Sequence, residues 1–461
     1  MKDIDKNAEH FDAVIIGGGP GGSATATTLA RAGCRVMVLE REQFPRYHVG
    51  ESLIPYTYLM LHRLGVLDKV KRAGFQHKPG FQFVSTSGRL TRPYYFVQSI
   101  RDAAATTWQV DRAKFDQLLL QHAQESGAEV RYGARVTGVI HDGNRVVGVR
   151  YSDEDDCVHE IEGTFVVDCS GRAGFLSRYF DLRVRDPVLD QLAIWRYIQG
   201  AHRQTGKDEG NIVVALLEPR GWFWWIPLAD GRVSVGVVSS ARHLKAQGIT
   251  LRDAFATCLQ SNPLLVEWTR DGQWLGDFRH TGDYSYSARA IAGEGWALVG
   301  DAATFIDPVF SSGVWMSLAT GALAGETIAN GLDRGDPSRA IFRDYEALFR
   351  RAETTLRFFL DGFYDPNFSA GAFFREHPEW ISEWGRILQG DVFDDNRAFN
   401  QFLLNYRHHL AAKKGQRADI FLPEGWTVDQ HTDDQHRVSC PPSFRFSSAW
   451  LRPLDPGQEA A

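Results

Sequence analysis

Residues 11–22 read Phe11-Asp-Ala-Val-Ile-Ile-Gly-Gly-Gly-Pro-Gly-Gly22, an apolar run that ends in a glycine-rich turn. An unbroken apolar run of this kind is typical of a parallel strand that is buried on both faces. The small residues that follow predict a helix over 21–32, and the next apolar run predicts a second strand over 35–40. The order of these elements indicates a βαβ unit.

The turn has the spacing G-x-G-x-x-G at Gly17, Gly19 and Gly22, with Pro20 between the last two. In a βαβ unit these glycines allow a tight turn, a close approach of backbone to a pyrophosphate, and close packing of helix on strand. Glu40 ends the second predicted strand, where an acid can bind a ribose. A plain turn is the alternative for three glycines alone, but the whole set predicts a dinucleotide site.

A second acid, far along the chain, favours FAD over NAD. Gly300-Asp301 follows an apolar run and precedes a further predicted helix. The carboxylate of Asp301 fits a contact to a ribityl hydroxyl of an extended cofactor, whereas an ordinary helix-capping aspartate is the alternative. We find no second strand–glycine–helix unit in the sequence, which suggests that another protein reduces the flavin.

The composition disfavours several classes of protein. The 461 residues are 43% apolar and 23% charged with a net charge of −6, which is typical of a globular enzyme and argues against a nucleic-acid partner. No apolar run approaches the roughly 20 residues that span a bilayer, and the polar start of the chain is unlike a signal peptide. The five cysteines show neither disulfide nor metal-ligand spacing, so we expect reduced thiols, no metal and a cytoplasmic protein.

The remaining patterns divide the chain into three predicted parts. Residues 1–80, 109–180 and 285–335 are expected to form a discontinuous dinucleotide-binding domain. Residues 81–108 and 181–284 predict an antiparallel substrate sheet with one face over a cavity, because strand-like runs rich in Trp, Tyr and Val lie there. A helical C-terminal region, 336–461, is expected to begin with a long amphipathic helix near Asp336-Pro337-Ser338, and its tail after about residue 447 is expected to be loose.

Four further motifs resemble the FADH2-dependent halogenases. They are Phe44-Pro-Arg-Tyr-His-Val-Gly-Glu-Ser-Leu53, Gly300-Asp-Ala-Ala-Thr-Phe-Ile-Asp-Pro-Val-Phe-Ser-Ser-Gly313, the W-x-W-x-I-P motif Trp222-Phe-Trp-Trp-Ile-Pro227, and Phe305-x-x-Pro308-x-x-Ser311-x-Gly313. Within this family the chain resembles the bacterial enzymes that act on pyrrolyl or tyrosyl groups tethered to a carrier protein. Asp283-Tyr-Ser-Tyr286 and Leu388-Gln-Gly-Asp-Val392 look like the pyrrolyl type in particular. The resemblance runs from Phe11 to Val392. It implies an α/β fold with α+β elements: a Rossmann-like FAD domain of the p-hydroxybenzoate-hydroxylase type, an antiparallel substrate domain and a helical C-terminal region.

In this family, reduced FAD and oxygen convert chloride or bromide to hypohalous acid, which travels along an internal passage to a lysine. By resemblance that lysine is Lys78, and Ser312 with Gly313 bind the halide through backbone N–H groups at the start of a helix. Lys78 either forms a chloramine as a neutral amine or hydrogen-bonds the acid as a cation. Without the resemblance, a solvated surface lysine and a capped turn are the ordinary interpretations.

The resemblance also implies a wall between flavin and substrate, which keeps the oxidant from hydroxylating the ring directly. The wall residues are Trp222, Trp224, Ile226 and Pro227. Core packing is the ordinary alternative for these residues. We predict as FAD contacts the residues Gly17, Gly19, Pro20, Gly22, Glu40, Arg41, Ser52, Arg112, Asp301 and Gly313.

One departure from the family pattern narrows the substrate. Tryptophan halogenases carry a glutamate shortly before the Ser/Thr-Gly pair, and this chain has Phe310 there. Free tryptophan is therefore disfavoured, and we expect an activated phenol or pyrrole, held on an acyl or peptidyl carrier protein. No general base is identified, because His77 is more typical of a structural residue and Glu51 of the flavin environment.

Three other functions share parts of this pattern. An FAD-dependent aromatic hydroxylase needs the glycines and Asp301, but neither Lys78 nor the tryptophan wall. A reductase of the geranylgeranyl type should lack W-x-W-x-I-P, and a non-catalytic flavin scaffold does not explain the lysine, halide pair and wall together. We therefore expect a halogenase of natural-product (antibiotic) biosynthesis, served by a separate NAD(P)H-dependent flavin reductase.

Overall fold

The computed structural model describes residues 10–392 except 187–188, 219–220, 247, 283, 366–372 and 374, together with 427–429 and 437–439. The chain divides into two compact units, Met1–Phe342 and Arg343–Ala461. In the part of the chain that is described, no helix is both long and apolar enough to cross a membrane.

The first unit contains an eight-stranded sheet around the glycine-rich turn. Its parallel strands follow the order β19, β10, β1, β2, β7. Strand β18 pairs antiparallel with β19, β9 pairs antiparallel with β10, and β8 pairs antiparallel with β9. The bounds are β1 (His10–Ile16), β2 (Val36–Leu39), β7 (Glu129–Arg131), β8 (Arg135–Asp142), β9 (Arg145–Ser152), β10 (Val158–Asp168), β18 (Ala292–Gly293) and β19 (Trp296–Leu298). Strands β2 and β19 are buried throughout, which is why their sequences are unbroken apolar runs.

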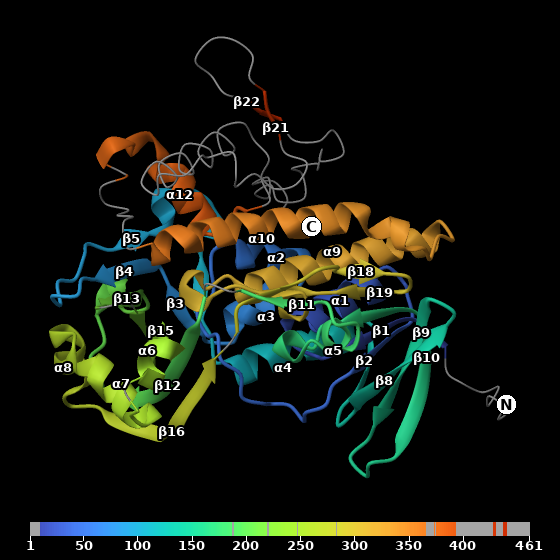
Figure 1. Ribbon diagram of the computed structural model, residues 1–461, viewed down its shortest axis with the longest axis horizontal. Coiled ribbons are helices and arrows are strands. Elements are labelled where there is room, and N and C mark those ends of the chain that lie inside the picture. Colours follow the sequence, from blue (N-terminus) through green and yellow to red (C-terminus); the bar gives the residue numbers. More distant parts are fainter. Residues whose placement is uncertain are drawn as a thin grey trace. The chain divides into compact units, whose positions relative to one another are not determined.

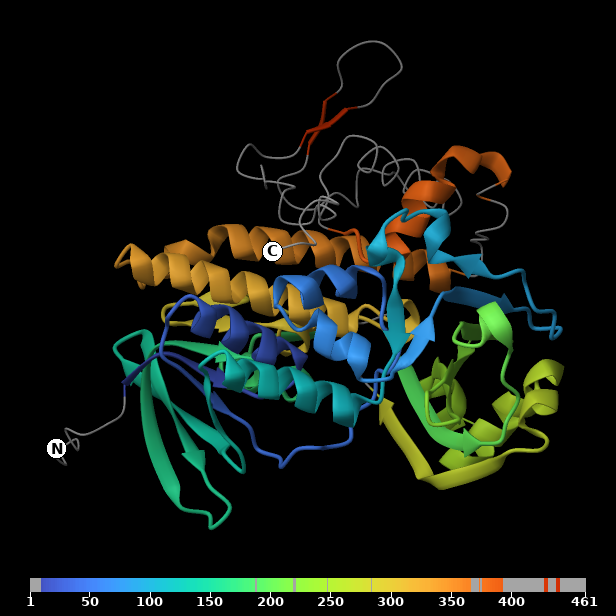
Figure 2. The same cartoon turned by 180° about the vertical axis from the view of Figure 1, so that it is seen from behind.

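Three helices pack together alongside this sheet. Helix α1 contacts both α4 and α9, and Figure 2 shows α1 beside α4. The bounds are α1 (Pro20–Arg31), α4 (Arg112–Glu125) and α9 (Gly313–Asp333), with the shorter helices α2 (Tyr56–Arg63), α3 (Leu67–Arg72) and α5 (Phe175–Tyr179). The βαβ unit predicted from the opening residues is therefore confirmed, with α1 beginning one residue earlier than expected.

A second sheet of seven strands has the order β16, β12, β15, β14, β13, β4, β5. All of its pairs are antiparallel except β13 with β4. The bounds are β4 (Gly80–Val84), β5 (Tyr94–Tyr95), β12 (Gln191–Gln199), β13 (Ile212–Leu217), β14 (Gly221–Pro227), β15 (Arg232–Ser240) and β16 (Gln273–Gly282). One face packs on α7 (Leu251–Gln260) and α8 (Pro263–Thr269) in a continuous apolar core (Figure 1). The antiparallel sheet predicted from the aromatic and Val-rich runs is confirmed.

Two short strands connect the sheets. The chain leaves α3 through β3 (Gln76–Lys78), passes into β4 and β5, and returns to α4 through β6 (Thr107–Gln109). Strands β3 and β6 pair antiparallel as a separate ribbon, with Lys78 opposite Thr107. A third sheet joins β11 (Arg183–Arg185), β17 (Tyr286–Ala288) and β20 (Thr304–Phe305).

The second unit begins with the predicted amphipathic helix, α10 (Arg343–Tyr364). The expected cap at Asp336 and Ser338 exists, but it caps a 3-10 turn, Arg339–Phe342, so that α10 starts later than predicted. This unit also has α12 (Ile381–Leu388), β21 (Thr427–Asp429) and β22 (Arg437–Ser439). Asp283 and the tail after residue 447 lie outside the described residues, and the bounds of the three predicted parts stay predictions.

Candidate functional site

The glycine-rich turn joins β1 to α1, and Gly17 and Gly22 have no room for a side chain. Gly17 has a φ of +98°, a conformation that favours glycine, and a Cβ on Gly22 would lie 1.9 Å from the carbonyl oxygen of Gly17. Gly19 is the N-cap of α1 and Pro20 its first residue, where a missing N–H loses no helical hydrogen bond. The backbone of this turn can therefore meet a pyrophosphate closely at a helix N-terminus.

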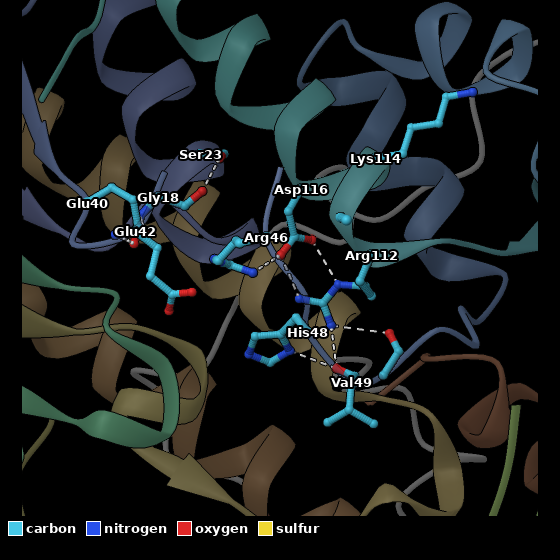
Figure 3. Close-up of polar contacts among 12 residues, drawn as sticks. Gly18, Ser23, Glu40, Glu42, Arg46, His48, Val49, Arg112, Lys114 and Asp116 are labelled. Carbon is cyan, nitrogen blue, oxygen red and sulfur yellow. Dashed lines mark hydrogen bonds and ion pairs between the residues drawn. The ribbon is translucent and has the colours of Figure 1, made fainter. Parts of the chain in front are cut away.

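Glu40 ties this turn to the end of β2. Its buried carboxylate accepts the backbone N–H of Gly18 at 2.7 Å and that of Glu42 at 2.9 Å (Figure 3). The acid thus lies beside the turn, where a ribose contact is predicted. Arg41 is exposed, and its guanidinium pairs with Glu42 at 3.2 Å. A contact of Arg41 with FAD stays a prediction.

A buried ion cluster holds the loop after β2. Arg112 donates hydrogen bonds of 2.8 and 3.0 Å to Asp116, and Arg46 donates a third of 3.0 Å (Figure 3). Arg112 also donates to the carbonyl oxygens of Val49 and Gly50. Burial by itself would raise the pKa of Asp116, but the two guanidinium groups outweigh burial and lower it. The sequence predicts Arg112 alone, although the i,i+4 spacing of Arg112 and Asp116 is a signal for the pair.

The Gly-Asp motif and the Ser-Gly motif meet at the start of α9. Asp301 lies in a 3-10 turn after β19, and its Oδ1 would be the nearest atom, at 4.0 Å, to a Cβ on Gly313. Ser312 is the N-cap of α9 without a side-chain capping bond, and Gly313 is the first helical residue. Burial raises the pKa of Asp301 to about 6, although Arg172 and Arg112 favour its ionised form. An acid and the N–H groups of a helix start therefore lie together.

Arg172 is a neighbour of this site that the sequence does not predict. It lies in the 3-10 turn Gly171–Ala173 after β10, and it is the strongest of the groups that favour the ionised form of Asp301. Its Nε is buried and has no hydrogen-bond partner among the described residues. A buried donor near Asp301 fits a polar cofactor such as FAD.

Lys78 is buried in β3, with 2% of its surface exposed. Its Nζ donates to Ser52 Oγ at 2.8 Å and to the carbonyl oxygen of Leu53 at 2.7 Å, and it lies 5.5 Å from the ring centre of Phe96. Burial lowers the pKa of Lys78 to about 7, so the neutral amine and the cation are both accessible near neutral pH. A solvated surface lysine is therefore excluded.

Strand β14 presents different side chains to its two faces. Phe223 and Trp225 belong to the apolar core under α7 and α8, and alternation along the strand places Trp222, Trp224 and Ile226 on the opposite face. The rings of Trp222 and Trp224 lie 6.0 Å apart, centroid to centroid. Three of the four predicted wall residues, Trp222, Trp224 and Ile226, are thus together on one face.

The position of Trp224 depends on a glycine in the neighbouring strand. A Cβ on Gly236 of β15 would lie 2.1 Å from the Trp224 ring, so the indole rests directly on bare backbone. Pro227 ends β14 opposite Val233, and alternation gives it the core face rather than the face of the tryptophans.

The carboxylate of Glu51 is connected to the tryptophan wall through Ser234. From the sequence, Glu51 was expected only to belong to the flavin environment. Glu51 is 2% exposed; Tyr197 donates to its Oε1 at 2.6 Å and Ser234 to its Oε2 at 3.4 Å. Ser234 in turn accepts the indole N–H of Trp224 at 3.1 Å. Tyr197 and Ser234 lie 146 and 183 residues from Glu51 along the chain, so local sequence carries no signal for this group.

The predicted residues thus gather in three places. Glu40 lies at the glycine-rich turn, Arg112 and Gly313 lie near Asp301, and Lys78 contacts Ser52. The roles assigned to them stay predictions.

The sequence matches the family model described as tryptophan halogenase over residues 12–96 and 84–379. It is 32% identical to the 1H-pyrrole-2-carbonyl-[peptidyl-carrier protein] chlorinase of Pseudomonas fluorescens, over 84% of this chain and 90% of that protein. It is 31% identical to the corresponding brominase of Pseudoalteromonas luteoviolacea, over 71% of this chain and 79% of the relative.

Solved structures of flavin-dependent halogenases are also similar to this chain. The flavin-dependent brominase Bmp2 superposes with a TM-score of 0.80 at 28% identity, covering 89% of this chain and all (100%) of that one. The myxobacterial chondrochloren halogenase CndH, an FAD-dependent enzyme, superposes with a TM-score of 0.73 at 32% identity, covering 88% of this chain and 97% of that one. This chain belongs to the tryptophan halogenase family and is an FAD-using, flavin-dependent halogenase.

Proposed function

We propose that this chain chlorinates or brominates a phenol or pyrrole ring that is held on an acyl or peptidyl carrier protein. Reduced FAD and oxygen supply the oxidising power that turns halide into hypohalous acid. The observation that carries the proposal is the buried amine of Lys78. A lysine with a strongly lowered pKa inside a protein is a functional-site candidate, because burial without use costs stability.

The residues on the carboxyl side of the parallel sheet hold the reactants in this proposal. The glycine-rich turn with Glu40 binds the pyrophosphate and ribose of FAD, and Asp301 binds its ribityl chain. The first N–H groups of α9, after Ser312 and at Gly313, bind the halide, because a helix start attracts anions.

Lys78 then carries the oxidant to the ring. With two N–H bonds donated to Ser52 and Leu53, the neutral amine keeps its lone pair and the cation keeps a third N–H. The lone pair can attack hypochlorous acid, giving N–Cl and water, or the third N–H can hydrogen-bond the acid. In both cases chlorine passes to a ring carbon, which loses its proton.

The tryptophan wall keeps the two halves of the reaction apart. Trp222 and Trp224 fill one face of β14, so that a bulky ring cannot approach the flavin while a small hypohalous acid can pass. Exclusion of water also protects the acid before it reaches Lys78.

The relatives support the choice of substrate. The names of the chlorinase and the brominase specify a pyrrole-2-carbonyl group on a peptidyl carrier protein. Phe310 stands where tryptophan halogenases have a glutamate, so this chain suits a ring that is already activated.

A separate NAD(P)H-dependent reductase is proposed to supply the reduced flavin, because the sequence has a single strand–glycine–helix unit. Such a pair would work in the cytoplasm, where NAD(P)H is present.

The test supplies the enzyme with a flavin reductase, NADH, oxygen, halide, and phenols or pyrroles, free and carrier-bound. We expect a product with a chlorine or bromine isotope pattern; a gain of one oxygen would instead show a hydroxylase. Lys78→Ala should lower halogenation at least about 100-fold and leave FAD binding and flavin oxidation intact.

The matched control is Lys114→Ala. Lys114, which Figure 3 labels on α4, is exposed, and its amine also donates to a backbone oxygen, that of Ala73. The Lys114→Ala variant should halogenate at the wild-type rate. Wild-type rates in Lys78→Ala would remove Lys78 from the mechanism.

A further inference from the structure

The short ribbon that carries Lys78 has a third stretch of chain beside it. Strand β3 pairs with one side of β6, and on the other side Ser52 forms an isolated antiparallel bridge to Gln109. Backbone hydrogen bonds before and after the bridge support this pairing. Strand β6 therefore lies between β3 and residues 51–53, with Lys78 on one side of it and Ser52 on the other.

Four polar side chains share one face of this arrangement. Residues that lie opposite each other in an antiparallel pair point to the same face, and so do residues two apart along a strand. Lys78 lies opposite Thr107 of β6. Gln109 is two residues further along β6 and lies opposite Ser52. The hydrogen bond of 2.8 Å from Lys78 Nζ to Ser52 Oγ confirms that the first and last of these side chains meet over one face. We call these four residues the polar row.

The polar row is buried, and two of its atoms are unpaired. Each of the four residues is at most 7% exposed. Neither Thr107 Oγ1 nor Gln109 Oε1 has a hydrogen-bond partner in the part of the chain that the structure describes. The amide nitrogen of Gln109 donates to the carbonyl oxygen of Gly210 at 3.1 Å, so the amide is held in place while its oxygen stays unpaired. Buried polar atoms are nearly always hydrogen-bonded, so this pair indicates a bound small polar molecule.

The two unpaired atoms are complementary to a hypohalous acid. This molecule, HO–X, has one O–H to donate and one oxygen that accepts. The hydroxyl of Thr107 can donate to that oxygen, and Oε1 of Gln109 can accept the O–H. Residues two apart on a strand are separated by roughly 6–7 Å, a spacing that one small molecule can bridge. A halide ion has no proton to donate and is repelled by an amide oxygen, so the pair favours the acid over the halide.

The amine of Lys78 is available to an acid held in this way. Its Nζ donates to Ser52 and to the carbonyl oxygen of Leu53, so the lone pair of the neutral amine is not used by either bond. An acid whose oxygen and proton are both held by β6 keeps its halogen free. The halogen is then the part of the molecule that can meet the amine.

We propose that Thr107 and Gln109 form the binding site for hypohalous acid beside Lys78. This inference rests on the function proposed above. In the amine route the balance is R–NH2 + HOX → R–NHX + H2O, where R is the side chain of Lys78. The N–X bond forms as the O–X bond breaks, and the oxygen leaves with its own proton and one amine proton as water. The hydroxyl of Thr107 donates to this oxygen while it gains negative charge.

The same site serves the route in which the cation of Lys78 only hydrogen-bonds the acid. The halogen then passes directly from HO–X to a ring carbon, and the ring proton and the hydroxide leave as water. Thr107 and Gln109 hold the oxygen in both routes, so the proposal does not depend on the choice between them.

The first test measures how the hypohalous acid divides between ring and solution. FAD-loaded enzyme receives a flavin reductase, NADH, oxygen, halide and the aromatic substrate, and taurine in solution traps escaped acid as an N-haloamine. Thr107→Val replaces the hydroxyl by a methyl group of similar size. We expect unchanged flavin oxidation, about twofold to tenfold less halogenated product, and a matching gain of trapped acid, the range that loss of one neutral hydrogen bond produces.

Two further variants separate the hydroxyl from the packing around it. Thr107→Ser keeps the hydroxyl and should restore most of the wild-type yield. Thr27→Val makes the same substitution at another buried position, where the hydroxyl donates to the carbonyl oxygen of Ser23 within α1 at 2.7 Å. Thr27→Val should divide the acid as the wild type does. If Thr107→Ser yields as little product as Thr107→Val, the hydroxyl is not what holds the acid and the proposal is wrong.

The second test needs no turnover. In a high-resolution crystal structure of the FAD-loaded enzyme, we expect one ordered water bonded to both Thr107 Oγ1 and Gln109 Oε1, because water offers the same O–H and oxygen. This water should be absent or displaced in Thr107→Val. Two outcomes would overturn the site: protein partners for both atoms, or a water there together with a wild-type product yield in Thr107→Val.

Failure of the site and failure of the proposed function have different signatures. A wild-type enzyme that gives neither halogenated product nor trapped acid contradicts the proposed function. A wild-type enzyme that halogenates, with Thr107→Val dividing the acid in the same ratio, contradicts only the binding site.

Discussion

The amine of Lys78 donates to two acceptors and has a pKa of about 7. If its lone pair takes the halogen, the active form is the neutral amine, whose fraction grows as pH rises through that value. We therefore expect the single-turnover rate of ring halogenation to rise through pH of about 7 and then to level off. A rate that falls over the same range would assign the hydrogen-bonding role to the cation instead.

Rapid-quench measurements at each pH check this expectation. The carboxyl of Asp301 titrates nearby, with a pKa of about 6, so FAD occupancy has to be measured in the same samples. Constant occupancy with a changing rate isolates the contribution of the lysine.

Residues whose partners are close in sequence were predictable, and residues with distant partners were not. Gly17, Gly22 and Glu40 belong to one βαβ unit, and their spacing alone predicts where they meet. Lys78 was identified by resemblance, because nothing in its local sequence predicts burial. Glu51 contacts a strand 146 residues away, so only the fold reveals its partner.

At the scale of elements, β14 and β15 position the wall through the contact of Trp224 with Gly236. Gly236→Ala introduces a methyl group where the indole lies, so the ring has to move. We expect flavin oxidation to continue while the amount of halogenated product per flavin oxidised falls several-fold, because the displaced ring no longer keeps hypohalous acid between flavin and Lys78. Product and hydrogen peroxide are measured together.

Gly138→Ala is a matched control in another antiparallel strand, β8. A Cβ there meets only Arg150, at ordinary distances of 3.6 Å and more. Unchanged coupling of flavin oxidation to halogenation in Gly236→Ala would show that the ring position does not seal the passage.

Strand alternation is readable from sequence, but pairing between distant strands is not. Trp222, Trp224 and Ile226 fall on one face by their even spacing, and the same rule gives Pro227 the other face. By contrast, three-residue strands such as β3 and β6 form only because the two sheets bring them together. Their pairing buries Lys78 and could not be predicted from so short a pattern.

At the scale of the whole molecule, the cluster of Arg46, Arg112 and Asp116 joins the loop after β2 to α4. Asp116→Asn leaves two buried guanidinium groups without their anion, so we expect the free energy of unfolding to fall by about 3–5 kcal/mol at neutral pH. Because the folded state lowers the pKa of Asp116, its stabilisation is complete above the unfolded pKa, near 3.8, and is lost as pH falls through the folded value.

Urea unfolding of both proteins at neutral and acid pH checks this. The difference between them should shrink in acid, where the wild-type carboxylate also becomes protonated. If the difference in unfolding free energy between the two proteins is independent of pH, the variant loses stability through packing rather than through charge.

The antiparallel ribbon of β3 and β6 has an evolutionary consequence. Since the excursion from Pro79 to Thr106 starts and finishes at neighbouring points, it can be exchanged between related enzymes as a cassette. Such a chimera would inherit a new residue at the position of Phe96, whose ring lies beside the lysine, while the host keeps its own amine at the border. Substrate range can thereby diversify without any rebuilding of the oxidant chemistry.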